Sequence, residues 1–293
     1  MSVLNGSPAA AAGEITLGGD LAVRRIGYGA MRITGEGIWG EPPDPGAARA
    51  LLRRVVELGV NFIDTADSYG PEVSERLIRE ALHPYPEEVV IATKGGLLRD
   101  GPSKWRPDCR PEHLKEACET SLRRLRLDTI DLYQLHTPDP QVPYEESVGA
   151  LSELREEGKI RHVGLSNVGR SHLAKAREIV PIVSIQNRYS VTSRDSEEVL
   201  KVCESEGLAF IPWFPLDTGS LATTDALEEI AKTHGVTSGQ VALAWLLLHS
   251  PAMVPIPGTS SIEHLEENVA AAGLRLSDEE LAHVEEAAVQ DAQ

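Results

Sequence analysis

Short apolar runs alternate with longer amphipathic stretches along the whole of this 293-residue chain. Eight such runs, each bounded by Gly, Pro or Asp, span residues 25–29, 61–64, 89–94, 130–136, 161–166, 182–186, 209–214 and 253–257. A clear helical pattern follows each of the first six runs. This alternation is typical of repeated strand–helix units with parallel strands. The pattern therefore predicts an α/β chain with eight strands.

The stretch after the third run shows the helical pattern well. Its apolar and small residues recur at a spacing of three and four, and they are Leu114, Ala117, Cys118, Ser121, Leu122 and Leu125. Pro111 stands at a favourable first position of that helix. We therefore expect Cys118 in the core of the protein and not as a reactive thiol.

The strands and helices are predicted to close into one barrel. Residues 15–23 form two short alternating runs around Gly18-Gly19-Asp20, which predicts a β-hairpin before the first barrel strand. Eight parallel strands with right-handed crossovers close naturally into a (β/α)₈ TIM barrel, and no linker divides the chain. We predict a flexible tail over residues 1–13 and a single barrel domain over residues 14–293.

A doubly wound open sheet is the alternative fold. That fold needs a glycine-rich phosphate loop directly after a strand, and the chain contains no GxGxxG sequence. Gly27-Tyr-Gly29 is only GxG. The barrel is therefore the preferred interpretation.

The composition narrows the class of partner. Lys and Arg number 28 against 45 Asp and Glu, so the net charge is −17, and no basic run interrupts it. A surface this negative repels phosphate backbones and anionic lipid headgroups, so we expect neither a nucleic-acid nor a membrane partner. Three cysteines without a CxxC pair predict no disulfide scaffold and no metal site. With no signal peptide in residues 1–13, we expect a cytoplasmic protein.

Polar residues end five of the predicted strands, and in a barrel the carboxyl ends of the strands form the reactive mouth. These residues are Asp64, Lys94, His136, Ser166 with the following Asn167, and Gln186. A single strand-end Asp or Lys is most often a cap or a solvated loop residue. Five such ends at one mouth instead indicate a functional site.

The chemistry of these residues suits the reduction of a carbonyl group or its reverse. Tyr69 follows Asp64 by five residues, so its loop can fold the phenol back over the strand end. A phenol, whose ordinary pKa is about 10, donates a proton near neutral pH only if a nearby charge stabilises its anion, and Lys94 supplies that charge. The imidazole of His136 both donates and accepts hydrogen bonds, so it can bind a carbonyl oxygen or share the proton.

The segment that reads Gly59-Val-Asn-Phe-Ile-Asp-Thr-Ala-Asp-Ser-Tyr-Gly70 resembles the signature segment of the aldo-keto reductase superfamily. Leu165-Ser-Asn167, Ser184-Ile-Gln186 and Pro255-Ile-Pro-Gly-Thr-Ser260 follow in the expected order, and the resemblance covers about residues 15–281. It implies a (β/α)₈ barrel that binds NADPH in extended form without a Rossmann motif. It also implies a catalytic tetrad of Asp64, Tyr69, Lys94 and His136.

The resemblance further implies the cofactor contacts. Ser166, Asn167 and Gln186 would hydrogen-bond the nicotinamide carboxamide, and Trp213 would stack on the ring, unless it is only a core aromatic. The segment Trp213-Phe-Pro-Leu-Asp217 stands where many members have Tyr-Ser-Pro-Leu-Gly, so the pyrophosphate loop that Gly219, Ser220 and Leu221 complete is altered. The expected cofactor residues are Gly29, Ala30, Met31, Asp64, Ser166, Asn167, Gln186, Trp213, Phe214, Pro215, Leu216, Gly219, Ser220, Gly258, Thr259, Ser260, His264, Glu267 and Asn268.

The site for the 2′-phosphate departs from the family pattern. Many members have Lys-Ser and a later Arg, whereas this chain has Gly258-Thr259-Ser260 and His264, so two positive charges are missing. Backbone N–H groups, two hydroxyls and the start of the following helix still favour an anion there. We therefore expect NADPH rather than NADH, by a small margin.

Loops after the first and third strands supply the expected substrate pocket, namely Met31, Arg32, Trp39 and Trp105. Trp39 could instead only pin its own loop. One amphipathic segment, residues 277–289, follows the last barrel helix, so we expect no long carboxyl-terminal substrate loop of the kind that some members have, and an open, broadly specific pocket. The loops at residues 35–44 and 104–110 are similar to those of bacterial members that include pyridoxal reductases.

The expected function is NADPH-dependent reduction of an aldehyde or ketone with Tyr69 as the general acid, by a protein we expect to be a monomer. The alternative is a nucleotide-binding regulatory subunit on the same fold with little turnover, because a fold does not by itself establish activity. No extended tail, repeat or coiled-coil heptad in the sequence favours that alternative.

Overall fold

The computed structural model describes residues 6–217 and 225–290, and its centre is a parallel sheet of seven strands in the order β11-β10-β9-β8-β5-β4-β3. The strands are β3 (Tyr28–Gly29), β4 (Phe62–Asp64), β5 (Val90–Gly95), β8 (Ile130–Leu135), β9 (Ile160–Ser166), β10 (Ile182–Arg188) and β11 (Ala209–Trp213). Their side chains are almost all buried, as expected for a parallel sheet covered on both faces.

The eighth predicted strand, residues 253–257, is an extended segment that joins the two edges of this sheet. Its Val254 N–H donates to the carbonyl oxygen of Phe210 on β11 at 2.8 Å, and its Pro255 carbonyl accepts from the N–H of Gly27 beside β3 at 2.9 Å. Pro255 and Pro257 have no N–H, so the segment cannot form a regular ladder. The ring still closes, which confirms the predicted barrel class with seven regular strands and one irregular segment.

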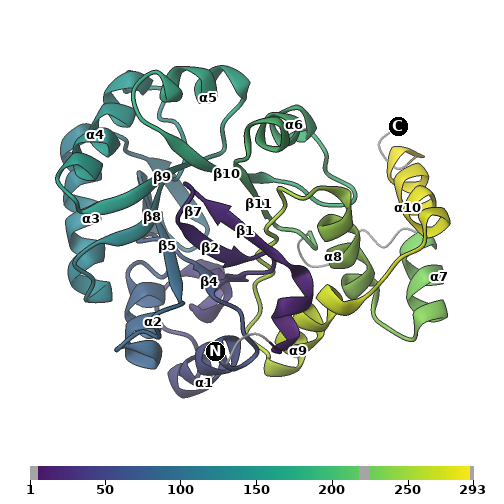
Figure 1. Ribbon diagram of the computed structural model, residues 1–293. Coiled ribbons are helices and arrows are strands. Elements are labelled where there is room, and N and C mark those ends of the chain that lie inside the picture. Colours follow the sequence, from purple (N-terminus) through teal and green to yellow (C-terminus); the bar gives the residue numbers. More distant parts are fainter. Residues whose placement is uncertain (1–5, 218–224, 291–293) are drawn as a thin grey trace.

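Helices surround this ring (Figure 1). They are α1 (Pro45–Glu57), α2 (Val73–Leu82), α3 (Pro111–Leu125), α4 (Tyr144–Glu156), α5 (Arg170–Arg177), α6 (Glu197–Glu206), α7 (Asp225–His234), α8 (Ser238–His249), α9 (Ile262–Ala270) and α10 (Asp278–Gln290). Helix α3 begins at Pro111 as predicted, and Cys118 is buried in its core-facing side. Helix α8 lacked a clear pattern in the sequence because it is buried and apolar on nearly all sides.

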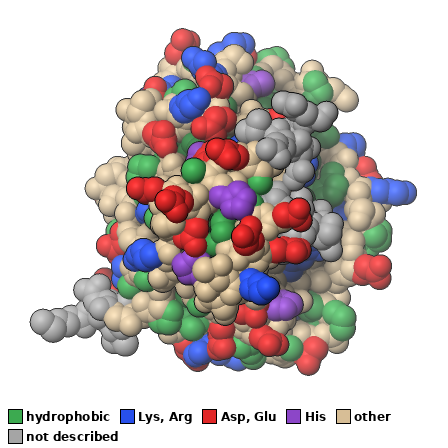
Figure 2. Space-filling view, turned by 90° about the vertical axis from the view of Figure 1, so that its right-hand side faces the viewer, with side chains coloured by type: hydrophobic (Ala, Val, Ile, Leu, Met, Phe, Trp, Pro, Cys, Tyr) green, Lys and Arg blue, Asp and Glu red, His purple; other side chains and the backbone are tan. Residues whose placement is uncertain are grey.

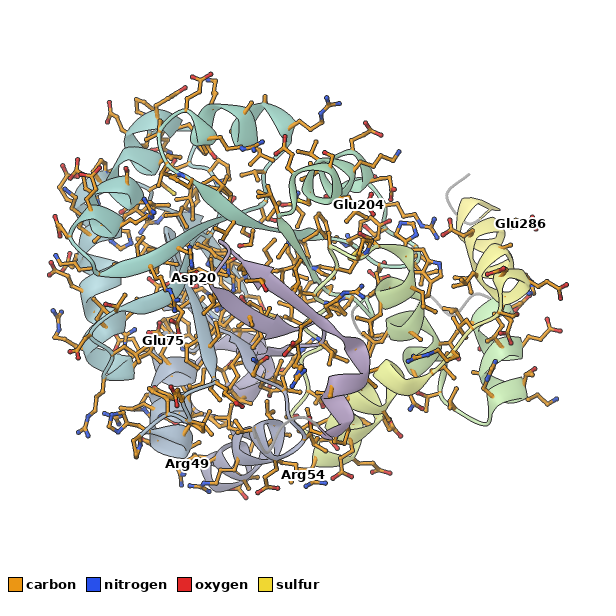
Figure 3. The ribbon with its side chains drawn as sticks, viewed as in Figure 1. Asp20, Arg49, Arg54, Glu75, Glu204 and Glu286 are labelled. Carbon is orange, nitrogen blue, oxygen red and sulfur yellow. The ribbon has the colours of Figure 1, made fainter. Side chains whose placement is uncertain are left out.

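The predicted amino-terminal hairpin is present, and it covers one end of the barrel. Strands β1 (Glu14–Leu17) and β2 (Leu21–Arg24) pair antiparallel, and Asp20, in their turn, lies beside the start of β9 (Figure 3). The Asp20 carboxylate accepts a 2.9 Å hydrogen bond from Arg161, at the start of β9. Gly18 has φ of 59°, and a Cβ there would lie 2.1 Å from the His162 ring, so the turn requires glycine. The hairpin leaves the opposite mouth, at the carboxyl ends of the strands, open.

Part of the expected amino-terminal tail is ordered structure, which corrects the prediction for residues 8–12. Pro8–Ala12 form a 3₁₀ helix, η1, and Ala9 is fully buried. The Ala9 N–H donates to the carbonyl oxygen of Leu58 at 3.1 Å. The small alanine side chains allow this helix to pack closely against the barrel, although they carry no periodic apolar signal.

Irregular segments that the sequence did not predict shape the open mouth. Strands β6 (Leu97–Gly101) and β7 (Lys104–Pro107) form an antiparallel hairpin directly after β5. Short 3₁₀ helices, η2 (Ala30–Ile33) and η3 (Glu36–Ile38), follow β3. A further one, η4 (Ala271–Gly273), follows α9 and packs against η1 and α8, not at the mouth. The hairpin and η3 both stand next to the strand ends that carry the polar residues.

Acidic side chains are spread over the face that α7 and α10 present, with fewer basic ones between them (Figure 2), in keeping with the net charge of −17. None of the helices in the described part of the chain is long and apolar enough to cross a membrane.

Candidate active site

A buried lysine at the end of β5 organises the mouth of the barrel. The Lys94 Nζ donates to Oδ1 of Asp64 at 2.6 Å and to the carbonyl oxygen of Thr65 at 2.8 Å. The phenol oxygen of Tyr69 lies 3.4 Å from the same nitrogen. Strands β4 and β5 pair in parallel register, so Asp64 and Lys94 reach the same mouth, as the sequence predicts.

Burial and the neighbouring charges set the protonation of this group. Burial lowers the pKa of Lys94, but the Asp64 carboxylate and the Tyr69 phenol outweigh this effect, and the net pKa is raised. Burial raises the pKa of Tyr69, and the positive charge of Lys94 opposes that rise only in part. At neutral pH the lysine is therefore charged and the phenol holds its proton.

His136 follows the last residue of β8 and faces the phenol. Its ring centroid lies 5.9 Å from that of Tyr69, with the two rings edge to face. Burial, together with the positive charge of Lys94, holds the pKa of His136 well below its usual value. Its Nδ1 has no hydrogen-bond partner among the described residues. The imidazole is therefore neutral at physiological pH and retains hydrogen-bonding capacity.

Two glutamines satisfy the second oxygen of Asp64. Oδ2 accepts from Gln186 Nε2 at 2.7 Å and from Gln134 Nε2 at 3.1 Å. Gln186 was expected to contact the nicotinamide, whereas its amide nitrogen here binds the carboxylate. Sequence reasoning missed Gln134, although it precedes His136 by two residues on β8 and therefore points to the same face.

A cleft of about 310 Å³ opens above these residues. Eleven of the expected cofactor residues line it, namely Gly29, Met31, Asp64, Ser166, Asn167, Gln186, Trp213, Phe214, Pro215, Leu216 and Gly258. The residues expected with them but not found in this lining are Ala30, Thr259, Ser260, His264, Glu267 and Asn268. Gly219, Ser220 and Leu221 lie outside the described residues.

The start of α9 lies directly beyond Gly258 at the edge of the cleft. Ser261 caps this helix by accepting a hydrogen bond from the N–H of His264. The Oγ1 of Thr259 accepts from the N–H of Ser261 at 3.0 Å, so this hydroxyl already orders the turn before the helix. The backbone amides of the first turn of α9 are the groups that favour an anion here.

The altered segment after β11 is held by a partly buried network around Asp217. The Oδ2 of Asp217 accepts from the hydroxyls of Ser190 and Thr192, each at 2.7 Å, and Oδ1 accepts from Arg188 at 3.1 Å. Burial raises the pKa of Asp217, but these donors outweigh burial and lower it overall. The Asp217 carboxylate, which stands where many members of the family have glycine, is thus held by hydrogen bonds within the protein. At the start of the same segment, Trp213 Nε1 donates to Oδ1 of Asn167 at 3.1 Å.

Three of the four expected substrate-pocket residues line the cleft, namely Met31, Arg32 and Trp105. The indole of Trp105 lies edge-on to Tyr69 and to His136, with centroid distances of 6.4 Å in each case. Trp39 does not line the cleft, and its backbone forms a bridge with Gly70, so it pins its own loop. Ile38 and Leu97 line the pocket in addition and were not expected.

No cluster of three or more His, Cys, Asp or Glu side chains in the described ranges could hold a metal ion. The free cysteines Cys109, Cys118 and Cys203 are all buried.

Comparison with known proteins gives consistent matches over the whole barrel. A model of the aldo/keto reductase family matches residues 25–289. An uncharacterised oxidoreductase of Schizosaccharomyces pombe is 50% identical over 279 residues, which cover 95% of this chain and 90% of that protein. Pyridoxine 4-dehydrogenase of Escherichia coli is 42% identical over 269 residues, which cover 90% of this chain and 94% of that protein. The structure of an aldo-keto reductase from Klebsiella pneumoniae in complex with NADPH has a TM-score of 0.79 and 29% identity, covering 93% of this chain and 94% of its own.

Proposed function

Since the chain belongs to the aldo/keto reductase family, and is an oxidoreductase of that family, we propose that it reduces aldehydes or ketones to alcohols with NADPH and with Tyr69 as the general acid. The observation that carries this proposal is the buried contact of Lys94 with both Asp64 and Tyr69 on the floor of the cleft. A charged lysine beside a protonated phenol is the arrangement that proton donation by tyrosine requires.

The residues around the cleft fit NADPH. Ser166 and Asn167 line the part of the cleft where the carboxamide would bind, and the Trp213 indole offers a flat surface to the ring. The first turn of α9, beyond Gly258, suits a phosphate, which supports NADPH over NADH although the usual cations are missing. The related enzyme from Klebsiella pneumoniae is in complex with NADPH. When bound, NADPH supplies the hydride.

The side chains of this protein supply the proton and its electrostatic support. Tyr69 donates its proton to the carbonyl oxygen as that oxygen becomes an alkoxide, and Lys94 stabilises the phenolate that remains. Asp64 keeps the lysine in place through the 2.6 Å contact. The neutral imidazole of His136 hydrogen-bonds the carbonyl oxygen and orients it toward Tyr69.

The walls of the cleft favour a planar, aromatic aldehyde. Met31, Ile38, Leu97 and Trp105 form an apolar surface above Tyr69, and such a surface with a few polar groups is typical of small-molecule pockets. The similarity to a pyridoxine 4-dehydrogenase adds pyridoxal to the candidate substrates.

The test is a spectrophotometric assay of NADPH oxidation against aromatic aldehydes, dicarbonyls and pyridoxal. We expect turnover with at least one aromatic aldehyde. Tight binding of NADPH without turnover on any compound would overturn the proposal and favour a nucleotide-binding regulatory subunit instead.

A further inference from the structure

Arg99, on β6, joins three segments that surround the substrate side of the cleft. Its Nη1 donates to the carbonyl oxygen of Ile38 at 2.6 Å, and its Nη2 donates to that of Gly37 at 2.7 Å. Nη1 also reaches the carbonyl oxygen of Ser68, the residue before Tyr69, at 3.3 Å. One guanidinium thus contacts the η3 turn, the Tyr69 loop and, through the carbonyl oxygens of Gly101 and Lys104, the β6–β7 hairpin.

The η3 turn has a backbone conformation that needs such support. Gly37 has φ of 66° and Ile38 has φ of 56°, so both lie in the left-handed region. A β-branched residue rarely adopts this conformation, and it persists only where surrounding contacts hold it. The two carbonyl groups of this turn are the ones that Arg99 binds, and the Ile38 side chain lines the cleft.

The same guanidinium also packs on the aromatic wall of the pocket. The Arg99 Cζ lies 3.7 Å from the ring centroid of Trp105 and 5.8 Å from that of Trp39. Among the ion pairs of the described residues, none joins Arg99 to a carboxylate. Its positive charge therefore faces carbonyl oxygens and indole rings, where a planar guanidinium binds and stacks better than an ammonium group.

The two loops that Arg99 joins also contact each other. The N–H of Ser103, at the tip of the β6–β7 hairpin, donates to the carbonyl oxygen of Gly37 at 2.9 Å. A Cβ on Gly37 would lie 2.9 Å from the Cβ of Pro102, so the loops meet closely at a glycine. The hairpin and the η3 turn are therefore packed directly against each other, and Arg99 binds both of them.

We propose that Arg99 is a positioning residue that fixes Trp105 and Ile38 as the wall of the substrate pocket, and that it thereby selects planar aromatic aldehydes over small aliphatic ones. The proposal rests on the proposed reductase function. An aromatic substrate above Tyr69 needs the Trp105 wall in one place, whereas a small aliphatic aldehyde has little apolar surface to bury against that wall. Arg99 itself does not line the cleft, so it acts through its neighbours.

The first experiment compares Arg99→Met and Arg99→Lys with Arg106→Met, a matched control on the same hairpin whose exposed side chain pairs with Asp100. For both Arg99 variants we expect KM for 2-naphthaldehyde to rise at least about tenfold, the range of an apolar pocket contact. We expect kcat, NADPH affinity and the kinetics with propanal to stay within about threefold of the wild type. Equal losses with both aldehydes, or no loss with either, would overturn the proposal.

A double variant tests whether Arg99 acts through Trp105. Trp105→Ala should lose the same selectivity for the aromatic aldehyde. Adding Arg99→Met to Trp105→Ala should reduce this selectivity little further, because the effects of two substitutions are not additive when the residues act as a unit. Full additivity of the two losses would show that Arg99 does not act through this indole.

Amide hydrogen exchange gives a measurement that needs no turnover. In Arg99→Met, exchange should become faster in peptides that cover residues 36–39 and 97–107, whereas Arg106→Met should leave these peptides unchanged. Unchanged exchange in Arg99→Met would overturn the positioning role. If the wild type reduces neither aldehyde, the proposed function and the proposed selectivity are both wrong. The hydrogen-exchange measurement still decides whether Arg99 holds the η3 turn and the β6–β7 hairpin in place.

Discussion

Gln186 Nε2 lies 2.7 Å from Oδ2 of Asp64, the carboxylate oxygen that Lys94 does not contact. The three donors to this buried carboxylate, Lys94, Gln134 and Gln186, come from three different strands. Each oxygen of Asp64 is therefore satisfied within the protein. The carboxylate is held in position, so that it can in turn hold Lys94 beside Tyr69.

We first predict that Gln186→Leu destabilises the protein. The substitution removes the shorter of the two amide hydrogen bonds to Oδ2 of Asp64 and should lower the free energy of unfolding by about 1–3 kcal/mol. Urea titration measures this change, with the exposed Gln141→Leu as a control that should shift it by less than about 0.5 kcal/mol. Unaltered stability, combined with a large loss of NADPH affinity, would show that Gln186 serves the cofactor and not Asp64.

The meeting of Asp64, Lys94 and His136 could be predicted from the sequence because each residue ends an apolar run, and parallel strands bring their carboxyl ends to one mouth. Gln134 escaped this reasoning because it lies inside an apolar run, where only the two-residue alternation with His136 reveals its direction.

The contacts of Arg99 could not be predicted in the same way. They go to backbone carbonyl groups, whose directions depend on the left-handed φ of Gly37 and Ile38, and no pattern of side chains encodes these angles. The order of residues 8–12 was missed for a related reason, because Ala9 and Ala12 fill small spaces without any periodic apolar signal.

A second prediction concerns Asp67, whose Oδ1 has no hydrogen-bond partner in the described part of the protein. Burial, with the nearby Glu75, raises the pKa of Asp67 to about 8. The unfolded chain releases this proton near pH 4, whereas the folded chain retains it until about pH 8, so this group lowers stability progressively as the pH rises from 4 to 8.

Asp67→Asn should remove this penalty. At pH 8 the variant should be more stable than the wild type by up to about 5 kcal/mol, the free energy of a pKa raised by about four units, and the difference should vanish near pH 4. Thermal or urea unfolding across this pH range measures it, with the exposed Asp128→Asn as the control. A constant difference at all pH values would contradict the assigned titration.

A third prediction addresses the choice of cofactor. Without the family's usual cations near Gly258 and His264, we expect a preference for NADPH over NADH that weakens as the salt concentration rises, because ions screen the phosphate. Thr259→Ala should weaken NADPH more than NADH, since its hydroxyl orders the turn before α9. Fluorescence titration of both cofactors at low and high salt is the measurement, with Thr233→Ala on α7 as control. Equal affinity at low salt would refute the 2′-phosphate site.

The pH profile of the reaction should distinguish the two candidate proton donors. Burial raises the pKa of Tyr69 above that of a free tyrosine, so the phenol keeps its proton through the neutral and mildly alkaline range, and the pKa of His136 lies well below its usual value. We therefore expect kcat/KM for reduction to stay level from about pH 6 to 9 and to fall only at higher pH, as Tyr69 ionises. A rate that declines steadily from acid pH toward neutrality would point to protonated His136 as the acid.

The last prediction removes the proposed acid itself. Tyr69→Phe keeps the ring but not the proton, so kcat should fall by about 10²–10⁴-fold while NADPH affinity stays close to that of the wild type. Tyr144→Phe, at a half-buried tyrosine, is a matched control, because its hydroxyl has no partner among the described residues and it starts α4, outside the cleft lining. Lys94→Met should also slow reduction, but it leaves the Asp64 carboxylate without its cation and should destabilise the fold as well. If Tyr69→Phe keeps turnover within about threefold of the wild type on the best substrate, Tyr69 is not the acid, and His136 becomes the candidate donor.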